Sequence, residues 1–230
     1  TVMVGSTAES LGLQSGDILL ELNDVRLNTT ADIISEIGKY RADDELRVTF
    51  SRKGEKQKVR GNALAKPKEQ SNIAEVIYGE VKYPENCLRT ILYRPIGVKN
   101  PPVVFYIQGY PCRSIDLPYS TDNPLMKLIN DWVAAGFAVY RIEKPGMGDS
   151  ESEKPCLELN FAEEVEVFKQ GFTDLQSQKN IDVENLFLFG HSIGGIIAPV
   201  LATDFSPKGV ITYGTVVNTW FEYMQELSRV

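Results

Sequence analysis

The sequence lacks a long hydrophobic run. Its longest uninterrupted apolar stretch extends only from Trp132 to Tyr140, whereas a transmembrane helix needs about 20 apolar residues. We therefore expect no membrane span. The chain also lacks an initiator methionine and a charged-then-apolar leader, since it begins at Thr1. Because residues 1–4 have the pattern of a strand interior, we expect sequence to precede Thr1, and no signal peptide can be assigned.

Positive charge is also scarce. The sequence holds 24 lysines and arginines against 31 acidic residues, a net charge of -7, and its pI is about 4.9. This balance disfavours nucleic acid and anionic membrane surfaces as partners, because both repel a negative protein. Neutral or cationic ligands are better suited to it. Apolar residues make up 43% and charged residues 24%, a composition typical of globular proteins and not of disordered or collagen-like chains.

The sequence also contains few cysteines. Cys87, Cys112 and Cys156 are an odd number with no metal-like spacing. Neither a disulfide framework nor a zinc site is expected from them, and no metal or cofactor is predicted. Cysteine content therefore leaves the compartment open.

A polar segment divides the chain into two unlike halves. Residues 60–72 contain Pro67 and lack apolar periodicity, as linkers do. A chain of 230 residues is long for one small domain and short for two complete ones. We therefore predict a first domain over 1–61, a linker over 62–72 and a second domain over 73–230, with at least one domain incomplete.

The first half has the pattern of a small α+β module. Residues 18–22 have the pattern of a strand, and apolar residues recur at helical spacing between Ile33 and Tyr40. Thr29 and Asp32 form a possible capping box at the start of that helix. Residues 46–50 alternate as in a half-buried strand, and residues 52–55 supply a hairpin turn.

In the second half, short apolar strands alternate with longer helical patterns, which is typical of a parallel sheet with crossover helices. The lead-in over 73–95 has an antiparallel pattern. The expected strands are 103–107, 137–142, 186–189 and 210–216, and the expected helices are 125–135, 161–178, 196–202 and a helix or lid segment within 220–230.

A glycine-rich turn follows the buried strand over 186–189. Its sequence is Gly190-His191-Ser192-Ile193-Gly194-Gly195, and a helical run begins directly after it. Strand before and helix after make this a nucleophile elbow, in which a serine sits in strained backbone geometry at a helix N-terminus. Side chains at positions 190 and 194 would clash. We predict Ser192 as the nucleophile and the Ile193 backbone N–H as an oxyanion donor. The alternative is a purely structural turn.

A second motif, Gln108-Gly109-Tyr110-Pro111, follows the strand over 103–107. This segment is similar to the His-Gly loop of the α/β-hydrolase family, with Gln108 where histidine is usual. The elbow adds to the resemblance to that family. The resemblance implies the backbone N–H of Tyr110 as the second oxyanion donor, since Pro111 has no N–H. An ordinary connecting loop is the alternative. Residues 145–150 resemble the glycine turn of the same family, which implies a pocket wall or a plain structural turn.

The proton acceptor for Ser192 is missing from this pattern. The single histidine, His191, adjoins the serine, and adjacent side chains diverge at an elbow, so we expect its imidazole to point away and pack under the sheet. In the family the acid and the histidine follow the nucleophile. We therefore expect both beyond Val230, and we expect residues 1–230 alone to be inactive.

Residues 5–19 resemble the PDZ modules of bacterial HtrA-type proteases. Ser6 can cap a short helix, and Gly12 can end it in left-handed geometry. The match extends over about residues 2–61, while the carboxylate-binding loop and its strand would precede Thr1. PDZ modules bind peptides by strand addition. The resemblance thus implies a peptide ligand and favours an extracytoplasmic location.

Together these features predict a bacterial serine hydrolase, an esterase or a peptidase, that forms an acyl-enzyme at Ser192 and carries a peptide-binding PDZ-like module. The predicted fold class is α/β, with a mostly parallel α/β-hydrolase-like sheet, flanking helices and a small α+β domain. The alternative is a peptide-binding interaction protein whose hydrolase half is a non-catalytic scaffold. Gln108 and the missing base keep this alternative open.

Overall fold

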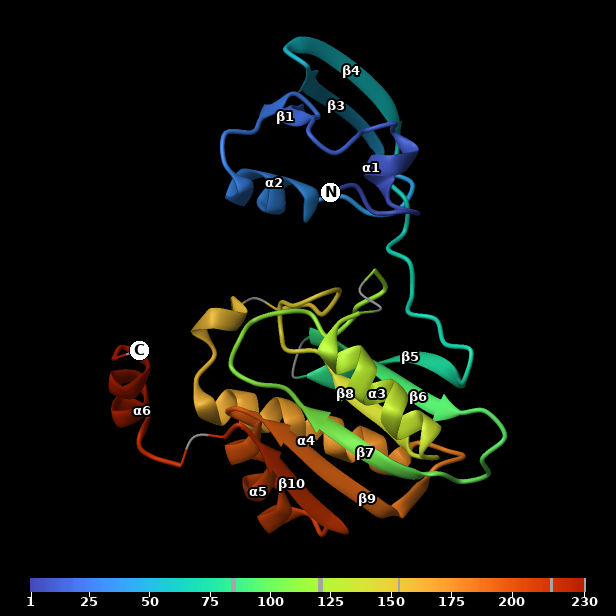
Figure 1. Ribbon diagram of the computed structural model, residues 1–230, viewed down its shortest axis with the longest axis vertical. Helices are drawn as coiled ribbons and strands as arrows, with labels where there is room; N and C mark the ends of the chain where they lie inside the picture. The colour runs from blue at the N-terminus through green and yellow to red at the C-terminus, as the bar shows by residue number, and fades with distance from the viewer. Residues whose placement is uncertain (84–85, 120–121, 153, 216, 230) are drawn as a thin grey trace. The chain divides into compact units, whose positions relative to one another are not determined.

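The computed structural model describes residues 1–83, 86–119, 122–152, 154–215 and 217–229 (Figure 1). The chain divides into two compact units, Thr1–Lys68 and Glu69–Val230. Each unit has its own sheet and its own buried apolar core.

The first unit is an antiparallel sheet with two helices. Its strands lie in the order β2-β1-β3-β4. The strands are β1 Ile18–Leu22, β2 Val25–Arg26, β3 Glu45–Arg52 and β4 Glu55–Asn62, and the helices are α1 Thr7–Ser10 and α2 Thr30–Ile37. The predicted strand over 18–22 is confirmed, and so is the hairpin turn, because Arg52 pairs with Glu55.

The predicted helix caps of this unit are present. The Ser6 side chain accepts a hydrogen bond from the backbone N–H of Glu9, and Thr29 and Asp32 form the expected capping box. These contacts satisfy N–H groups that have no partner within the first helical turn. Gly12 follows α1 with a φ of 74°, a left-handed conformation that glycine adopts without steric penalty.

The second unit is built on a six-stranded sheet in the order β10-β9-β7-β8-β6-β5. The first four of these strands are parallel, and β6 and β5 run antiparallel at the other edge. The strands are β5 Ala74–Tyr83, β6 Asn86–Pro95, β7 Pro102–Ile107, β8 Ala138–Ile142, β9 Asp182–His191 and β10 Gly209–Tyr213. The predicted antiparallel lead-in and mostly parallel sheet are both confirmed.

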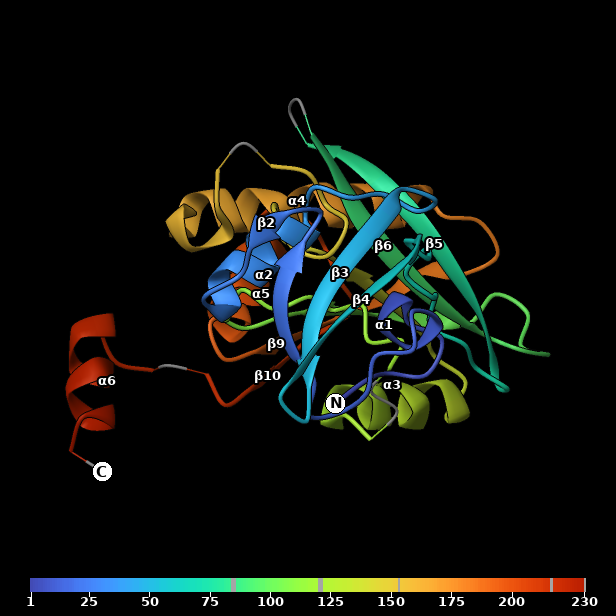
Figure 2. The same ribbon diagram turned by 90° about the horizontal axis from the view of Figure 1, so that it is seen from above.

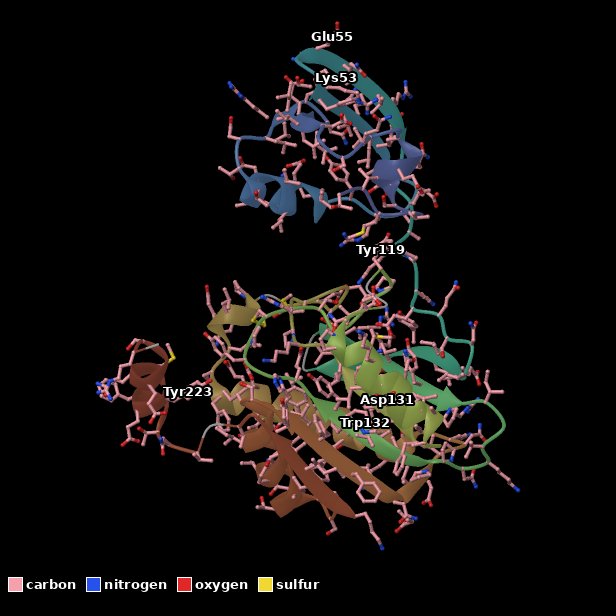
Figure 3. All side chains as sticks on the ribbon, in the orientation of Figure 1. Lys53, Glu55, Tyr119, Asp131, Trp132 and Tyr223 are labelled. Carbon is pink, nitrogen blue, oxygen red and sulfur yellow. A yellow bond between two sulfur atoms is a disulfide. The ribbon has the colours of Figure 1, made fainter. Side chains whose placement is uncertain are left out.

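Helices cover both faces of this sheet (Figure 2). One face packs against α3. The ring of Trp132 in α3 (Figure 3) lies against the ring of Phe189 in β9, with the ring centroids 4.9 Å apart. The other face packs against α4 and α5, which share one apolar core with the central strands. The helical elements are α3 Pro124–Ala134, the 3-10 helix η1 Cys156–Glu158, α4 Phe161–Ser177, α5 Gly194–Asp204 and α6 Trp220–Leu227. No helix in the described ranges combines the length and apolar character that a membrane crossing requires.

Strand register brings three loops together at one edge of the sheet. Ile107 in β7 pairs with Gly190 in β9, and Tyr213 in β10 pairs with His191. The residues that follow β7, β9 and β10 therefore emerge side by side at the carboxyl edge. This is where ligands bind in open α/β sheets. The edge strand β10 was predicted over 210–216. It ends at Tyr213, and Val216 lies outside the described residues.

One expectation needs correction. Residues 1–3 form no strand, because the N–H of Ser6 donates to the carbonyl of Met3 and a turn begins there. Several residues of the predicted linker over 62–72 contact the folded units. Its first residue belongs to β4, Ala63 is buried in the first core, and Glu69 is buried in the second unit. Only residues 65–68 connect the two folded parts.

Candidate active site

Ser192 lies on a sharp turn between a strand and a helix. β9 ends at His191, α5 begins at Gly194, and Ser192 has a φ of 56°. A non-glycine residue rarely occupies this left-handed region unless the surrounding structure holds it there. The N–H of Ser192 donates to the carbonyl of Tyr213 at 3.0 Å, and its carbonyl accepts from the N–H of Gly195 at 2.9 Å. Both sides of the turn are therefore fixed.

The glycines at the turn are required by close backbone contacts. A Cβ at position 190 would lie 2.1 Å from the carbonyl oxygen of Gly194. A Cβ at position 194 would lie 2.2 Å from the carbonyl oxygen of Ile107. Real Cβ atoms do not approach backbone oxygens so closely, so a side chain at either position would displace the backbone of the turn.

The loop after β7 lies directly against Ser192. A Cβ at position 109 would be 3.0 Å from the Cβ of Ser192 and 3.3 Å from the carbonyl oxygen of His191. Gly109 thus allows the backbone that leads into Tyr110 to pass beside the serine. On the other side, Ile193 precedes α5, and among the described residues its backbone N–H donates no hydrogen bond. The two backbone groups predicted as oxyanion donors therefore belong to segments that flank the same serine.

Two buried polar atoms next to this turn have no hydrogen-bond partner within the described ranges. They are Nε2 of Gln108, which precedes the loop glycine, and Oγ1 of Thr215. The Thr215 oxygen lies 2.6 Å from where a Cβ of residue 195 would be. Because buried polar groups are nearly always paired, unpaired ones mark positions where a further polar group can be bound.

His191 does not contact the hydroxyl of Ser192 through any hydrogen bond among the described residues. Its ring instead stacks on that of Tyr213, with centroids 5.9 Å apart. The imidazole therefore lies at the carboxyl end of β9, on the same face of the sheet as the ring of Tyr213. Stacking on a neighbouring strand explains this position, since the two residues are paired in register.

The glycine turn over 145–150 is tied to a strand. Gly146 and Gly148 have φ values of 73° and 59°. Asp149 holds the guanidinium of Arg89 in β6, and the hydroxyl of Ser150 accepts from the Arg89 N–H at 2.8 Å. These contacts fix the turn against the sheet and favour the structural alternative for this motif.

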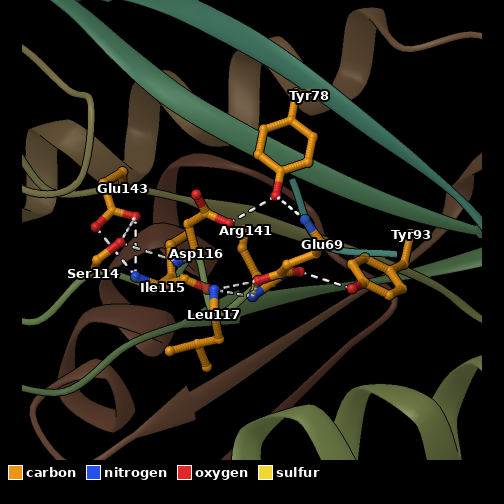
Figure 4. Close-up of polar contacts among 9 residues, drawn as sticks. All are labelled: Glu69, Tyr78, Tyr93, Ser114, Ile115, Asp116, Leu117, Arg141 and Glu143. Carbon is orange, nitrogen blue, oxygen red and sulfur yellow. Dashed lines mark hydrogen bonds and ion pairs between the residues drawn. The ribbon is translucent and has the colours of Figure 1, made fainter. Parts of the chain in front are cut away.

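Carboxylates hold the segment that follows the Gly109 loop (Figure 4). Both oxygens of Glu143 accept from the backbone N–H of Ile115, at 3.1 and 3.0 Å. Oε1 of Glu69 accepts from the backbone N–H of Leu117 at 2.6 Å. Residues 114–117 therefore rest on two buried carboxylates, one of which comes from the predicted linker.

Glu69 is itself held by a buried cation. Its Oε2 lies 2.6 Å from Nη2 of Arg141, and both side chains are at most 1% exposed. Tyr93 donates to the same carboxylate at 2.7 Å, and Tyr78 donates to Asp116 at 2.7 Å (Figure 4). Burial, reinforced by these carboxylates, raises the pKa of both tyrosines well above the usual value, so both remain protonated donors.

A lysine that the sequence analysis did not single out lies beneath the loop. The side chain of Lys144 is fully buried and directly follows Glu143 after β8. Its Nζ donates to the carbonyl of Gly109 at 2.8 Å and lies 3.4 Å from that of Tyr110. Glu164 in α4 forms an ion pair with it at 3.1 Å. Burial lowers the pKa of Lys144, and Glu164 partly offsets this effect.

The expectation of no disulfide is wrong. Cys112, just after the loop, is bonded to Cys156 in η1, and Cys87 is free. The partners are 44 residues apart, so only folding brings them together. The bond connects the end of the Gly109 loop to the segment before α4. Within the described ranges, no group of three or more His, Cys, Asp or Glu side chains is placed to hold a metal ion.

Each half of the chain matches a known protein family. Residues 2–61 match the PDZ domain family, and residues 123–230 match the family described as serine aminopeptidase, S33. No curated protein matches the sequence.

Similar solved structures cover the second unit. The α/β hydrolase GrgF from Penicillium sp. sh18 is 16% identical with a TM-score of 0.52, over 67% of this chain and 52% of that one. The esterase Est22 is 15% identical with a TM-score of 0.52, over 65% and 47%. DcsB, solved with its substrate analogue, is 17% identical with a TM-score of 0.52, over 67% and 51%. The chain therefore spans about half the length of these proteins.

The α/β-hydrolase fold of the second unit is indicated by the sheet order and the strand-to-helix turn at Ser192, and these matches agree with it. The chain consists of a PDZ domain followed by a unit with the α/β-hydrolase fold.

Proposed function

We propose that this protein is a serine hydrolase that cleaves ester or peptide bonds through an acyl-enzyme at Ser192. The observation that carries the proposal is the backbone of Ser192. Its φ of 56° places it on a strained turn at the N-terminus of α5, with the Gly109 loop against its Cβ. Strain of this kind persists at nucleophiles because it presents the hydroxyl at the edge of the sheet.

The reaction begins when the Ser192 oxygen attacks a substrate carbonyl carbon and its proton passes to a base. The carbonyl oxygen becomes an oxyanion, which the backbone N–H groups of Ile193 and Tyr110 stabilise by hydrogen bonds. The N-terminus of α5 adds a favourable positive potential. Collapse of the tetrahedral intermediate expels the alcohol or amine and leaves an acyl-enzyme, which water then hydrolyses.

The base is not His191. It is the only histidine in the sequence, and its ring stacks on Tyr213 without a hydrogen bond to the serine among the described residues. We therefore propose that residues 1–230 by themselves turn over esters only at the small residual rate that an oxyanion hole supports without a base, roughly 10³-fold over water.

The match to the PDZ domain family supports the proposal that the first unit binds a peptide. PDZ domains pair an extended peptide with a sheet edge beside a helix, and here α2 lies beside the β1–β3 sheet. The disulfide supports an extracytoplasmic location, because such bonds persist in oxidising compartments.

A fluorophosphonate probe tests the nucleophile in the natural gene product. We expect the probe to label Ser192 alone, identified by mass spectrometry of the modified peptide, and Ser192→Ala to remove the label. A matched control is Ser206→Ala, which changes an exposed serine after α5 and leaves labelling intact. Labelling that persists in Ser192→Ala, or that falls on another serine, would show that the nucleophile is wrongly assigned.

A second candidate function is that of a peptide-binding protein with a non-catalytic hydrolase scaffold. It is favoured by Gln108, where the family has histidine, and by the ring of His191, which stacks on Tyr213 and forms no hydrogen bond to the Ser192 hydroxyl among the described residues. Absence of any probe labelling, together with peptide binding by the folded protein in a fluorescence-polarisation titration, would support this candidate against the first.

A further inference from the structure

Lys144 stands out among the buried charged groups because it contacts the backbone of the Gly109 loop. Its ammonium donates to the Gly109 carbonyl oxygen at 2.8 Å and lies 3.4 Å from that of Tyr110. The lysine is fully buried, and its only described carboxylate partner is Glu164 at 3.1 Å. A buried ammonium is costly unless it is paired and hydrogen-bonded. The contacts with the loop are therefore part of what allows the charge to remain there.

The geometry of the peptide bond connects this contact to the candidate oxyanion hole. The carbonyl of Gly109 and the N–H of Tyr110 belong to one planar peptide unit, and in a trans peptide they point in opposite directions. No cis peptide occurs among the described residues. When Lys144 holds the Gly109 carbonyl, it therefore also fixes the direction of the Tyr110 N–H, which is turned away from the lysine.

We propose that Lys144 is a positioning residue that sets the orientation of the Tyr110 N–H in the oxyanion hole. The proposal rests on the proposed function, because it gives that N–H a catalytic use. The ammonium also polarises the peptide unit, since a charge-assisted bond to the carbonyl makes the N–H of the same unit a stronger donor. Lys144 thus acts on the oxyanion through a peptide bond and without touching the substrate.

A purely structural role for Lys144 predicts a different pattern. If the lysine served only to pair with Glu164, then removal of either partner would have the same consequences. If it positions the loop, Glu164→Gln disturbs the ion pair but leaves the ammonium on Gly109, whereas Lys144→Met keeps the length of the side chain and removes the donor. The two single variants therefore separate the two roles.

NMR of the uniformly labelled full chain tests the placement without any requirement for activity. We expect Lys144→Met to shift the Tyr110 amide resonance and to raise its hydrogen-exchange rate at least 10-fold. Glu164→Gln should lower the free energy of unfolding, because it leaves a buried charge unpaired, but should leave the Tyr110 amide resonance near its position in the unaltered chain. The double variant Lys144→Met/Glu164→Leu removes both buried charges, a replacement that proteins commonly tolerate. It keeps the test decisive if the single lysine variant fails to fold, and we expect it to show the same change at Tyr110.

Kinetics of the natural gene product tests the catalytic consequence. With an activated ester, we expect the folded lysine variant to lose kcat with little change in KM, approaching the roughly 10²- to 10³-fold loss seen when an oxyanion donor is removed. Glu164→Gln should retain kcat within a few-fold. An unchanged Tyr110 amide in both lysine variants, or an equal disturbance by Glu164→Gln, would overturn the positioning role. Ester turnover that survives Ser192→Ala would instead overturn the proposed function, while the NMR result would still decide the placement of the loop.

Discussion

At the scale of single residues, the conformation of Ser192 depends on its neighbours having no side chain. Gly190→Val and Gly194→Val would each place a branched Cβ about 2 Å from a backbone oxygen. We expect each variant to destabilise the second unit by more than about 2 kcal/mol and to lose probe labelling. Thermal unfolding followed by circular dichroism measures the first effect.

Gly97→Ala is the matched control for the glycine variants. Gly97 also has a positive φ, 79°, but nothing lies within 4 Å of its Cβ position. It should therefore show the modest cost of the backbone conformation alone, about 1 kcal/mol. A melting temperature near that of the unaltered protein for either valine variant would contradict the assignment of a tight turn.

Because of Asp17, the first unit should become less stable as the pH falls. Arg52 donates to both of its oxygens, at 2.8 and 2.6 Å, and the N–H of Gln14 adds a third bond. These contacts, led by Arg52, hold the pKa of Asp17 below its usual value. Because the folded pKa is depressed, the stabilisation is complete above the unfolded pKa of about 3.9 and disappears as the pH falls through the folded value.

We therefore expect Asp17→Asn to lower the urea midpoint of the first unit at pH 7 and to reduce the difference between pH 7 and pH 2. NMR signals of Val48, in the first core, report on this unit. Asp24→Asn, at an ion pair whose aspartate side chain is 75% exposed, is the control and should change little. Equal midpoints for Asp17→Asn and the unaltered chain at pH 7 would contradict the prediction.

At the scale of elements, the sequence predicts most strands and helices but not the contacts between distant segments. The strands of the second unit are continuous apolar runs, so their existence is visible, although β9 extends beyond the apolar core over 186–189 to Asp182–His191. The elbow is visible because its glycines are local. The ion pair of Glu69 with Arg141 joins residues 72 apart, and the disulfide joins residues 44 apart, so no local pattern reveals either one.

The Glu69–Arg141 pair should contribute strongly to the second unit. Removal of one member of a buried pair leaves an unpaired charge, which costs about 3 to 5 kcal/mol. We expect Glu69→Gln to lower the free energy of unfolding by about this amount. Trp132 in α3 packs on Phe189 in β9, so its fluorescence during urea unfolding reports on the second unit.

The control for this prediction is Glu75→Gln. Glu75 pairs with Arg94, but its side chain is 58% exposed, so we expect a loss below about 1 kcal/mol. Equal losses for Glu69→Gln and Glu75→Gln would show that the buried pair has no special weight.

At the scale of the whole molecule, the Cys112–Cys156 bond should stabilise one unit and not the other. It closes a loop of 44 residues within the second unit, and all three cysteines follow residue 68. In the chain-entropy description such a loop contributes about 4 kcal/mol. We expect a reducing agent to lower the melting temperature of the second unit by about 10 °C.

The first unit supplies an internal control for this experiment, because its unfolding should be unaffected by the reducing agent. A Cys112→Ser/Cys156→Ser variant should melt like the reduced protein and should not respond to reductant. Identical melting of the second unit under both conditions, with free thiols verified by mass, would contradict the stabilising role of the bond.

The burial of Glu69 also determines where the chain can be cut. The N–H of Leu64 is bound by the Thr7 hydroxyl at 2.9 Å, and Glu69 is held by Arg141, so the connecting segment is limited to residues 65–68. Proteases require extended, accessible chain on both sides of the bond that they cleave. Of the two lysines in this segment, Lys66 precedes Pro67, which trypsin does not accept, and Lys68 precedes the buried glutamate. We therefore expect this junction to resist trypsin although it has the composition of a cleavable linker, and we expect limited digestion to leave the PDZ domain attached to the hydrolase fold.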